Sequence, residues 1–453
     1  HLQTVAPDAR FWRIELPQRA EDALLLTWRA AQGNRQVAMH PATGELLPMP
    51  WGRKTEGGRH FMLFHYMLHG GIPGFWVVGW ISMCALVALV SGVVVHRRIF
   101  ADFFTFRPGK GQRSWLDAHN ATAVLTLPFL FMIVYTGVAF FYTSYMPWPL
   151  QAAYGEQAYA RYQKDLSHEA PPPARPRSGT PAALLPLAPL VQSAESLLQQ
   201  PASMVVVEQP GDRSALVRVM ASKEGRASSG TILNPTGTVA YDGVSGAVLQ
   251  VKKSESPAAF STEQIHGVVE ALHLVHFGGW AMKWLYFVSG LLGTAMISTG
   301  TILFMVKRRK KSELEFGAGT AAVYRVVEAL NVTAMAGICV ASIAFFYANR
   351  LLPAALPGRE LWEVRAFLGV WALMGIHALL RSPARAWVEQ FGVAAVLCLA
   401  LPLLNAVTTG EHLVAYAARG DGQSLGVELT AIGCGLLMGY MAWRVRRKWR
   451  VAA

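Results

Sequence analysis

Charged residues and the short motifs of soluble enzymes are scarce in this sequence. Only 15% of its 453 residues are charged, whereas 53% are hydrophobic, which excludes an ordinary soluble domain. No GxGxxG, Walker-type, HExxH or GxSxG motif is present, so the sequence predicts no nicotinamide or flavin site of its own. The four cysteines form no CxxC or CxxCH motif, which excludes covalently attached haem c and favours a packing role.

Long apolar runs are what the sequence has instead. A helix needs about 20 mostly apolar residues to cross the hydrocarbon core of a bilayer. Seven segments meet this condition: 74–98, 120–146, 282–306, 324–348, 361–381, 387–408 and 425–444. The sequence therefore predicts an α-helical polytopic membrane protein.

The positive charge follows the predicted spans. The net charge is +13, and Lys and Arg gather at alternate span ends, around residues 96–113, 307–311, 381–385 and 444–450. By the positive-inside rule these ends are cytoplasmic. The C-terminus is then cytoplasmic, and residues 1–73 and 147–281 are periplasmic in a bacterial inner membrane. The positive charge is explained by the orientation of the chain in a lipid membrane, and no nucleic-acid partner is predicted.

An internal repeat organises the first two thirds of the chain. Residues 37–47 and 239–249 each read as a strand, a turn closed by Gly44 or Gly246, and a second strand. The interval from His65 to Gly92 equals that from His273 to Gly300, 27 residues. The repeat unit is thus a helix, a small α+β periplasmic module and another helix.

The repeat also defines the expected domains. These are a first module (1–73), a helix pair with a basic cytoplasmic loop (74–146), a linker with the second module (147–281), a further span (282–311) and a four-helix extension (312–453). The first copy has no leading helix in this sequence, and a periplasmic N-terminal module must be delivered across the membrane. We therefore expect a preceding transmembrane helix with a histidine near its cytoplasmic end, or a cleaved signal peptide.

Six histidines near span ends are candidate haem ligands, because ionisable residues at membrane depth usually serve function. A neutral imidazole binds iron through one ring nitrogen while the other is held by a hydrogen bond. The outer group is His65, His69, His273 and His276, and the inner group is His96 and His119. The groups are too far apart to share one haem, which predicts two b-type haems. A purely interfacial role is the alternative for each histidine.

The pairing within the outer group stays open. Repeat alignment favours His65 and His273, whereas closeness to the membrane favours His69 and His276. The second member of each pair would bind a haem propionate or substrate. Five further histidines have other predicted roles: His40, His60, His168 and His412 are expected to be solvated, and His377 to pack or bond a carbonyl.

The run from residue 91 to 120, together with Lys283-Trp-Leu-Tyr-Phe287, resembles the PepSY-associated transmembrane family, the PiuB-type iron-regulated proteins. One branch, the FoxB-like proteins, comprises inner-membrane siderophore reductases with two haems. The resemblance implies an oxidoreductase that reduces ferric siderophores in the periplasm and releases Fe²⁺ for iron uptake. An unidentified cytoplasmic reductase or a quinol would donate the electrons, and the catalytic residues stay unknown. Basic residues that could bind haem propionates or dock the donor are Arg97, Arg98, Arg107, Arg113 and Lys283.

Two other functions remain alternatives. A siderophore transporter would use the last four spans as a pathway and would need broken helices or buried charges, for which Pro402 and Glu428 are the candidates. A non-enzymatic sensor would bind ligand through its periplasmic modules. A visible haem spectrum separates both from the reductase.

Overall fold

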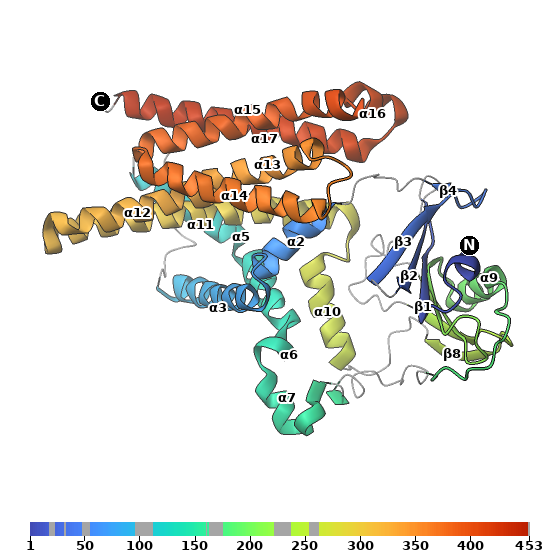
Figure 1. Ribbon diagram of the computed structural model, residues 1–453. Helices are drawn as coiled ribbons and strands as arrows, with labels where there is room; N and C mark the ends of the chain where they lie inside the picture. Colours follow the sequence, from blue (N-terminus) through green and yellow to red (C-terminus); the bar gives the residue numbers. More distant parts are fainter. Residues whose placement is uncertain are drawn as a thin grey trace. The chain divides into compact units, whose positions relative to one another are not determined.

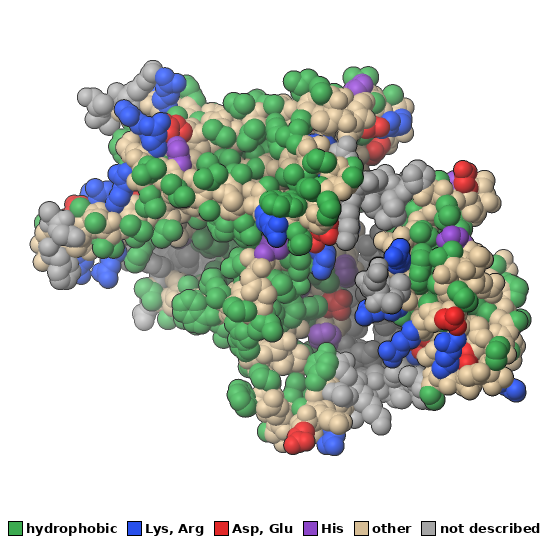
Figure 2. Space-filling model, viewed as in Figure 1, with side chains coloured by type: hydrophobic (Ala, Val, Ile, Leu, Met, Phe, Trp, Pro, Cys, Tyr) green, Lys and Arg blue, Asp and Glu red, His purple; other side chains and the backbone are tan. Residues whose placement is uncertain are grey.

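A computed structural model describes residues 1–17, 23–30, 33–47, 55–95, 112–159, 161–162, 175–221, 237–252 and 262–451. Within these residues seven helices are long and apolar enough to cross a membrane (Figure 1): Gly71–Val95, Leu116–Phe140, Gly279–Glu315, Ala321–Leu351, Arg359–Leu380, Pro383–Thr409 and Gly422–Trp449. Hydrophobic side chains cover much of the visible surface of the long helices (Figure 2). The predicted polytopic helical fold is confirmed, and the chain is a membrane protein.

Contacts divide the chain into two compact units. The first contains His1–Gly52, Ile72–Arg97 and Leu125–Leu291, and the second contains Arg53–Gly71, Arg98–Val124 and Leu292–Ala453. The segment Arg53–Gly71, which follows the first sheet module in sequence, therefore belongs with the C-terminal helices.

An eight-stranded antiparallel sheet forms the centre of the first unit. Its order is β4-β3-β2-β1-β5-β6-β7-β8, so β1 (Phe11–Glu15) and β5 (Ala202–Glu208) join the two modules. Outward from this joint, each module continues in chain order. The first module adds β2 (Leu24–Ala30), β3 (Gly33–Met39) and β4 (Leu46–Leu47), and the second adds β6 (Leu216–Ala221), β7 (Thr238–Asp242) and β8 (Val248–Lys252). This mirrored order confirms the predicted duplication.

The two predicted hairpins are β3–β4 and β7–β8. Ala38 pairs with Leu47 in the first, and Tyr241 pairs with Val248 in the second. Their turns contain Gly44 at φ +70° and Gly246 at φ +74°. Only glycine adopts such angles without steric cost, which explains why both turns end on this residue.

One face of the sheet carries the hydrophobic core of the first unit. Alternate residues point to the same face of a strand, and on this face Trp12 of β1 lies among Val205 and Val207 of β5. Two short helices cover the face, α1 (Leu2–Val5) and α9 (Leu187–Leu198). The indole Nε1 of Trp12 donates to the carbonyl of Ala6 at 2.9 Å.

A helix–turn–helix follows each module. In the first copy α2 (Gly58–Met67) leads into α3 (Gly71–Val95), and in the second α10 (Thr262–Leu274) leads into α11 (Gly279–Phe316). Gly71 and Gly279 both have φ +59°, so the two copies make the same turn. After α3 the chain continues with α5 (Gln112–Phe140), which leads the second copy, and then with α6 (Tyr142–Tyr145), α7 (Pro147–Tyr154) and the 3-10 turn η1 (Gly155–Gln157).

The four predicted C-terminal spans belong to the second unit. Their helices are α12 (Ala321–Val332), α13 (Ile338–Leu351), α14 (Arg359–Leu380), α15 (Pro383–Thr409), α16 (Leu413–Arg419) and α17 (Gly422–Val451), with a 3-10 turn, η3 (Gly317–Thr320), before α12. A π-helical turn, η4 (Thr333–Gly337), connects α12 and α13 within one span. Arg359, Glu363 and Glu428 are at most 1% exposed, so this unit buries charged side chains.

Replacing Trp12 by alanine should destabilise the sheet. The substitution removes a buried aromatic ring at the joint of the two modules and its hydrogen bond to Ala6. We expect a loss of about 3–5 kcal/mol in the free energy of unfolding, measured by thermal or denaturant unfolding in detergent. Trp148→Ala is the control, because Trp148 is 75% exposed. Equal losses in both variants would contradict the described core.

Candidate functional site

His119, on α5, packs against one turn of α11 in the second unit. Its Nδ1 lies 2.9 Å from the carbonyl oxygen of Met296 and 3.3 Å from the hydroxyl of Thr299. A Cβ added at Gly300 would lie 3.0 Å from Cε1 of His119, so only glycine leaves room for the ring. We name residues 296–300 the Thr-Gly turn of α11.

The hydrogen bonds of His119 determine its tautomer. A carbonyl oxygen can only accept, so Nδ1 carries the proton and donates. The hydroxyl of Thr299 donates to Ala295 O at 2.8 Å and keeps a lone pair for His119. In the neutral ring, Nε2 is then the nitrogen with a lone pair free to bind a metal.

His273, on α10, repeats this geometry in the first unit. Its Nδ1 lies 3.1 Å from Ile133 O and 3.2 Å from the hydroxyl of Thr136 on α5. Thr136 in turn donates to Met132 O at 2.7 Å. A Cβ added at Gly137 would lie 2.9 Å from Cε1 of His273. The Thr-Gly turn of α5, residues 133–137, therefore holds His273 as the Thr-Gly turn of α11 holds His119.

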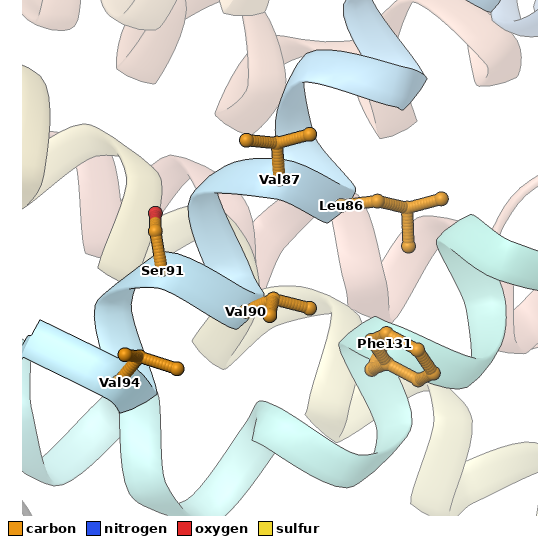
Figure 3. A pocket seen from close by; sticks show the side chains of 6 residues that line it. All are labelled: Leu86, Val87, Val90, Ser91, Val94 and Phe131. Atoms are coloured by element: carbon orange, nitrogen blue, oxygen red, sulfur yellow. The ribbon is translucent and has the colours of Figure 1, made fainter.

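A related sequence lies on α3, where Ser91 precedes Gly92. Ser91 Oγ donates to Ala88 O at 3.2 Å, and among the described residues no atom lies within 4 Å of a Cβ added at Gly92. Ser91 lines a groove of about 550 Å³ whose other walls are aliphatic residues of α3 and Phe131 of α5 (Figure 3). This turn thus faces an apolar groove.

His69 is held by His60 in the second unit. Nε2 of His69 lies 3.0 Å from the carbonyl oxygen of His60 and 2.9 Å from its Nδ1. The ring of His60 stacks between His69, at 4.8 Å between centroids, and Phe345, at 4.2 Å. Burial, and then repulsion from His69, lower the pKa of His60 to about 4.

The predicted solvation of His60 is wrong. The side chain is 0% exposed, because aromatic residues of α13 and α14 that are distant in sequence close over it. The prediction rested on the polar residues around position 60, and no local pattern indicates that Phe345 packs there. The exposure predicted for His40 and His412 is confirmed.

His377 pairs with a carboxylate rather than a carbonyl. Its Nε2 lies 2.8 Å from Glu389 Oε2, and its Nδ1 lies 3.2 Å from the side-chain amide of Gln390. The prediction that His377 packs or bonds a carbonyl therefore did not include its carboxylate partner. His377 lies on α14, and Glu389 and Gln390 lie on α15. Only the packing of these two helices brings the three side chains together.

The other predicted site residues are placed as follows. His65, His276 and Lys283 are exposed, and the ammonium of Lys283 lies 5.4 Å from the Trp280 ring centroid. His96, Arg97, Arg98, Arg107 and His168 lie outside the described residues, as does the side chain of Arg113.

One histidine near the site was missed by the sequence analysis. His266 precedes His273 by two helical turns on α10, and both rings stack on Phe140, at 5.8 and 6.4 Å between centroids. The seven-residue spacing, which places both on one face of a helix, was the available signal.

These features define a polytopic membrane protein with a duplicated sheet module and histidines held by helical turns. The model of the PepSY-associated TM region matches residues 2–307, and the chain belongs to this family. It is also 26% identical over 398 residues to an uncharacterized protein of Pseudomonas aeruginosa, covering 84% of this chain and 93% of that one. That coverage exceeds the family region, so the similarity includes part of the C-terminal helices.

Substituting the glycines beneath the two histidines should destabilise the protein. Gly300→Ala and Gly137→Ala place a methyl group against an imidazole ring, and we expect a loss of about 1–3 kcal/mol in unfolding free energy. Gly290→Ala, also on α11, is the control, since a Cβ there meets no described atom within 4 Å. Helix propensity predicts a gain of about 0.5–1 kcal/mol for the control. Thermal unfolding in detergent measures this difference in sign, and the same sign in all three variants would refute the described contacts.

Proposed function

We propose that this protein is a transmembrane haem b electron-transfer protein that reduces ferric siderophores at the periplasmic face of the bacterial inner membrane. The observation that carries the proposal is the pair of Thr-Gly turns. Each hydrogen-bonds Nδ1 of one histidine and fixes the Nδ1–H tautomer, in which Nε2 is the nitrogen that would bind iron.

The residues present fit haem as a ligand. Haem iron takes a neutral imidazole as axial ligand, and a hydrogen bond from the other ring nitrogen orients the ring and raises its basicity. Nδ1 of His119 and Nδ1 of His273 each make such a hydrogen bond, and each ring packs against a glycine of the neighbouring helix. A bound haem would supply one-electron transfer.

Two haems at different depths agree with the position of the two turns along the chain. His119 lies in the first half of α5, and the Thr-Gly turn that holds His273 lies near the end of the same helix. For a straight helix this difference is roughly 25 Å at 1.5 Å per residue. One histidine would therefore hold iron near each face of the membrane, and electrons would cross between the faces.

The proposed reaction moves one electron to each ferric ion. A quinol or a cytoplasmic reductase supplies the electron, Fe³⁺ in the siderophore becomes Fe²⁺, and the siderophore then holds the metal much more weakly. His69, and the exposed His65 and His276, would act at the outer face as ligand, propionate partner or substrate contact. Lys283, together with Arg97, Arg98, Arg107 and Arg113, would bind propionates or dock the donor.

Transport of intact siderophore through the C-terminal helices is a second candidate function. It is favoured by the buried carboxyl of Glu428, whose Oε1 accepts from Asn405 at 2.9 Å. Its Oε2 has no hydrogen-bond partner among the described residues. Buried ionisable groups in transmembrane helices commonly mark substrate or ion pathways. A purified protein without a haem spectrum, but with siderophore uptake in vesicles, would favour this function.

Replacing either histidine held by a Thr-Gly turn should lower the haem content. His119→Ala and His273→Ala each remove one iron ligand, so each variant should retain about one of two haems. The measurement is the haem-to-protein ratio by the pyridine haemochrome spectrum. His412→Ala, at an exposed position, is the control and should keep both haems. Full haem content in both test variants would rule out this ligand assignment.

The same variants should also separate haem binding from substrate reduction. In vesicles that contain a reductant on the donor side, His273→Ala and His119→Ala should reduce an external ferric siderophore only at the background rate. The product is followed with a ferrous chelator, and His412→Ala should retain the normal rate. Unchanged ferric reduction in a variant that has lost haem would contradict a reaction through the haem sites.

A further inference from the structure

The helix that carries His65 and leads into His69 depends on the C-terminal helices for its packing. α2 has ten residues, fewer than the 12–15 that an isolated helix needs to be even marginally stable in water. Its aromatic side chains pack against α13 and α14. The ring centroid of Phe64 lies 5.1 Å from that of Phe367 and 5.5 Å from that of Trp371, both in edge-to-face contacts. His60 stacks on Phe345.

A buried carboxylate anchors the residues just before α2. Oε2 of Glu363, on α14, accepts from the hydroxyl of Thr55 at 2.7 Å and from the backbone N–H of Glu56 at 3.1 Å. Its Oε1 accepts from Arg359 at 2.6 Å and from Asn349 at 2.9 Å. Glu363 is 0% exposed, so the loss of Thr55 and Glu56 would leave a buried charged oxygen unsatisfied, which is costly.

The turn after α2 is under backbone strain. Leu68 and His69 have φ of 52° and 56°, in the left-handed region that is unfavourable for a residue with a side chain. Such strain persists only where surrounding contacts determine the conformation, and it is common at functional sites. Here the contacts are the stacked rings of His60 and Phe345 and the bond from His69 Nε2 to the His60 carbonyl.

We propose that α13 and α14 hold α2 in place and thereby orient His69 at the outer site. The hydrogen bond to the His60 carbonyl makes Nε2 of His69 a donor, so Nδ1 keeps the lone pair and is the nitrogen offered to iron or substrate. The role of His69 at that site rests on the proposed function. The holding of α2 by the C-terminal helices does not.

Hydrogen exchange tests the holding of α2 directly. Glu363→Gln replaces one carboxylate oxygen by an NH2 group that cannot accept. Either the donors of Thr55 and Glu56 or those of Arg359 and Asn349 then lose their acceptor, and Arg359 loses its counter-charge. Exchange of the amides of residues 55–69 should become at least roughly tenfold faster. Glu389→Gln is the control, because it neutralises a carboxyl of the same unit that is bonded to His377 and Arg381 instead. It should leave residues 55–69 unchanged.

A pair of variants at His60 separates packing from imidazole chemistry. His60→Phe keeps an aromatic ring on Phe345, so exchange in residues 55–69 should stay within about twofold, whereas His60→Ala removes the ring and should accelerate it. Unchanged exchange in Glu363→Gln, or equal acceleration in Glu389→Gln, would overturn the holding role.

The orientation of His69 needs its own measurement. In the haem-loaded protein, Glu363→Gln should shift the low-spin resonance signals of one haem while the haem count stays constant. Glu389→Gln should change neither the signals nor the haem count. In any state of loading, nitrogen NMR of labelled histidine should show His69 losing its single tautomer in Glu363→Gln. A protein that binds no haem but shows the exchange and NMR effects would refute the proposed function alone. A His69 tautomer that is insensitive to Glu363→Gln would refute the orienting role.

Discussion

An imidazole within an apolar helix bundle must have its N–H hydrogen-bonded, because an unsatisfied polar group there costs several kcal/mol. Helical carbonyls are normally used by the helix itself, but a glycine lets a neighbouring ring approach closely enough to share one. Thr299 and Thr136 supply a second acceptor, since each hydroxyl donates to its own helix. These hydrogen bonds thereby fix the orientation of each imidazole ring.

The two histidines that the Thr-Gly turns hold do not occupy equivalent positions in the repeat. His119 belongs to the helix before the second module, and His273 to the helix after it, yet both rings rest on the same backbone arrangement. The sheet modules, by contrast, are related by duplication and share one continuous sheet through β1 and β5. The membrane helices therefore use the same local arrangement twice, once around His119 and once at residues 133–137 of α5.

The C-terminal helices contribute buried charges as well as apolar surface. Arg359 and Glu363 satisfy one another at 2.6 Å with both side chains at most 1% exposed, and the residues before α2 complete the coordination of Glu363. Removing one member of such a group leaves an uncompensated charge, so these polar contacts specify one arrangement of α2 more strongly than apolar packing alone. This gives the helices beyond the family region a physical connection to a candidate site residue.

The sequence by itself determined the seven spans, the duplicated modules and the two hairpins. Their signals are local: an apolar run long enough for a bilayer, alternation along a strand, and glycines such as Gly44 and Gly246 where the turn needs positive φ. It also identified His119 and His273 as candidates. Only the tertiary structure decided that β1 pairs with β5 and that His60 is buried against Phe345. It also decided which ring nitrogen of His119 and of His273 carries the proton. These depend on contacts between residues distant in sequence, whose register and facing side chains no local pattern specifies.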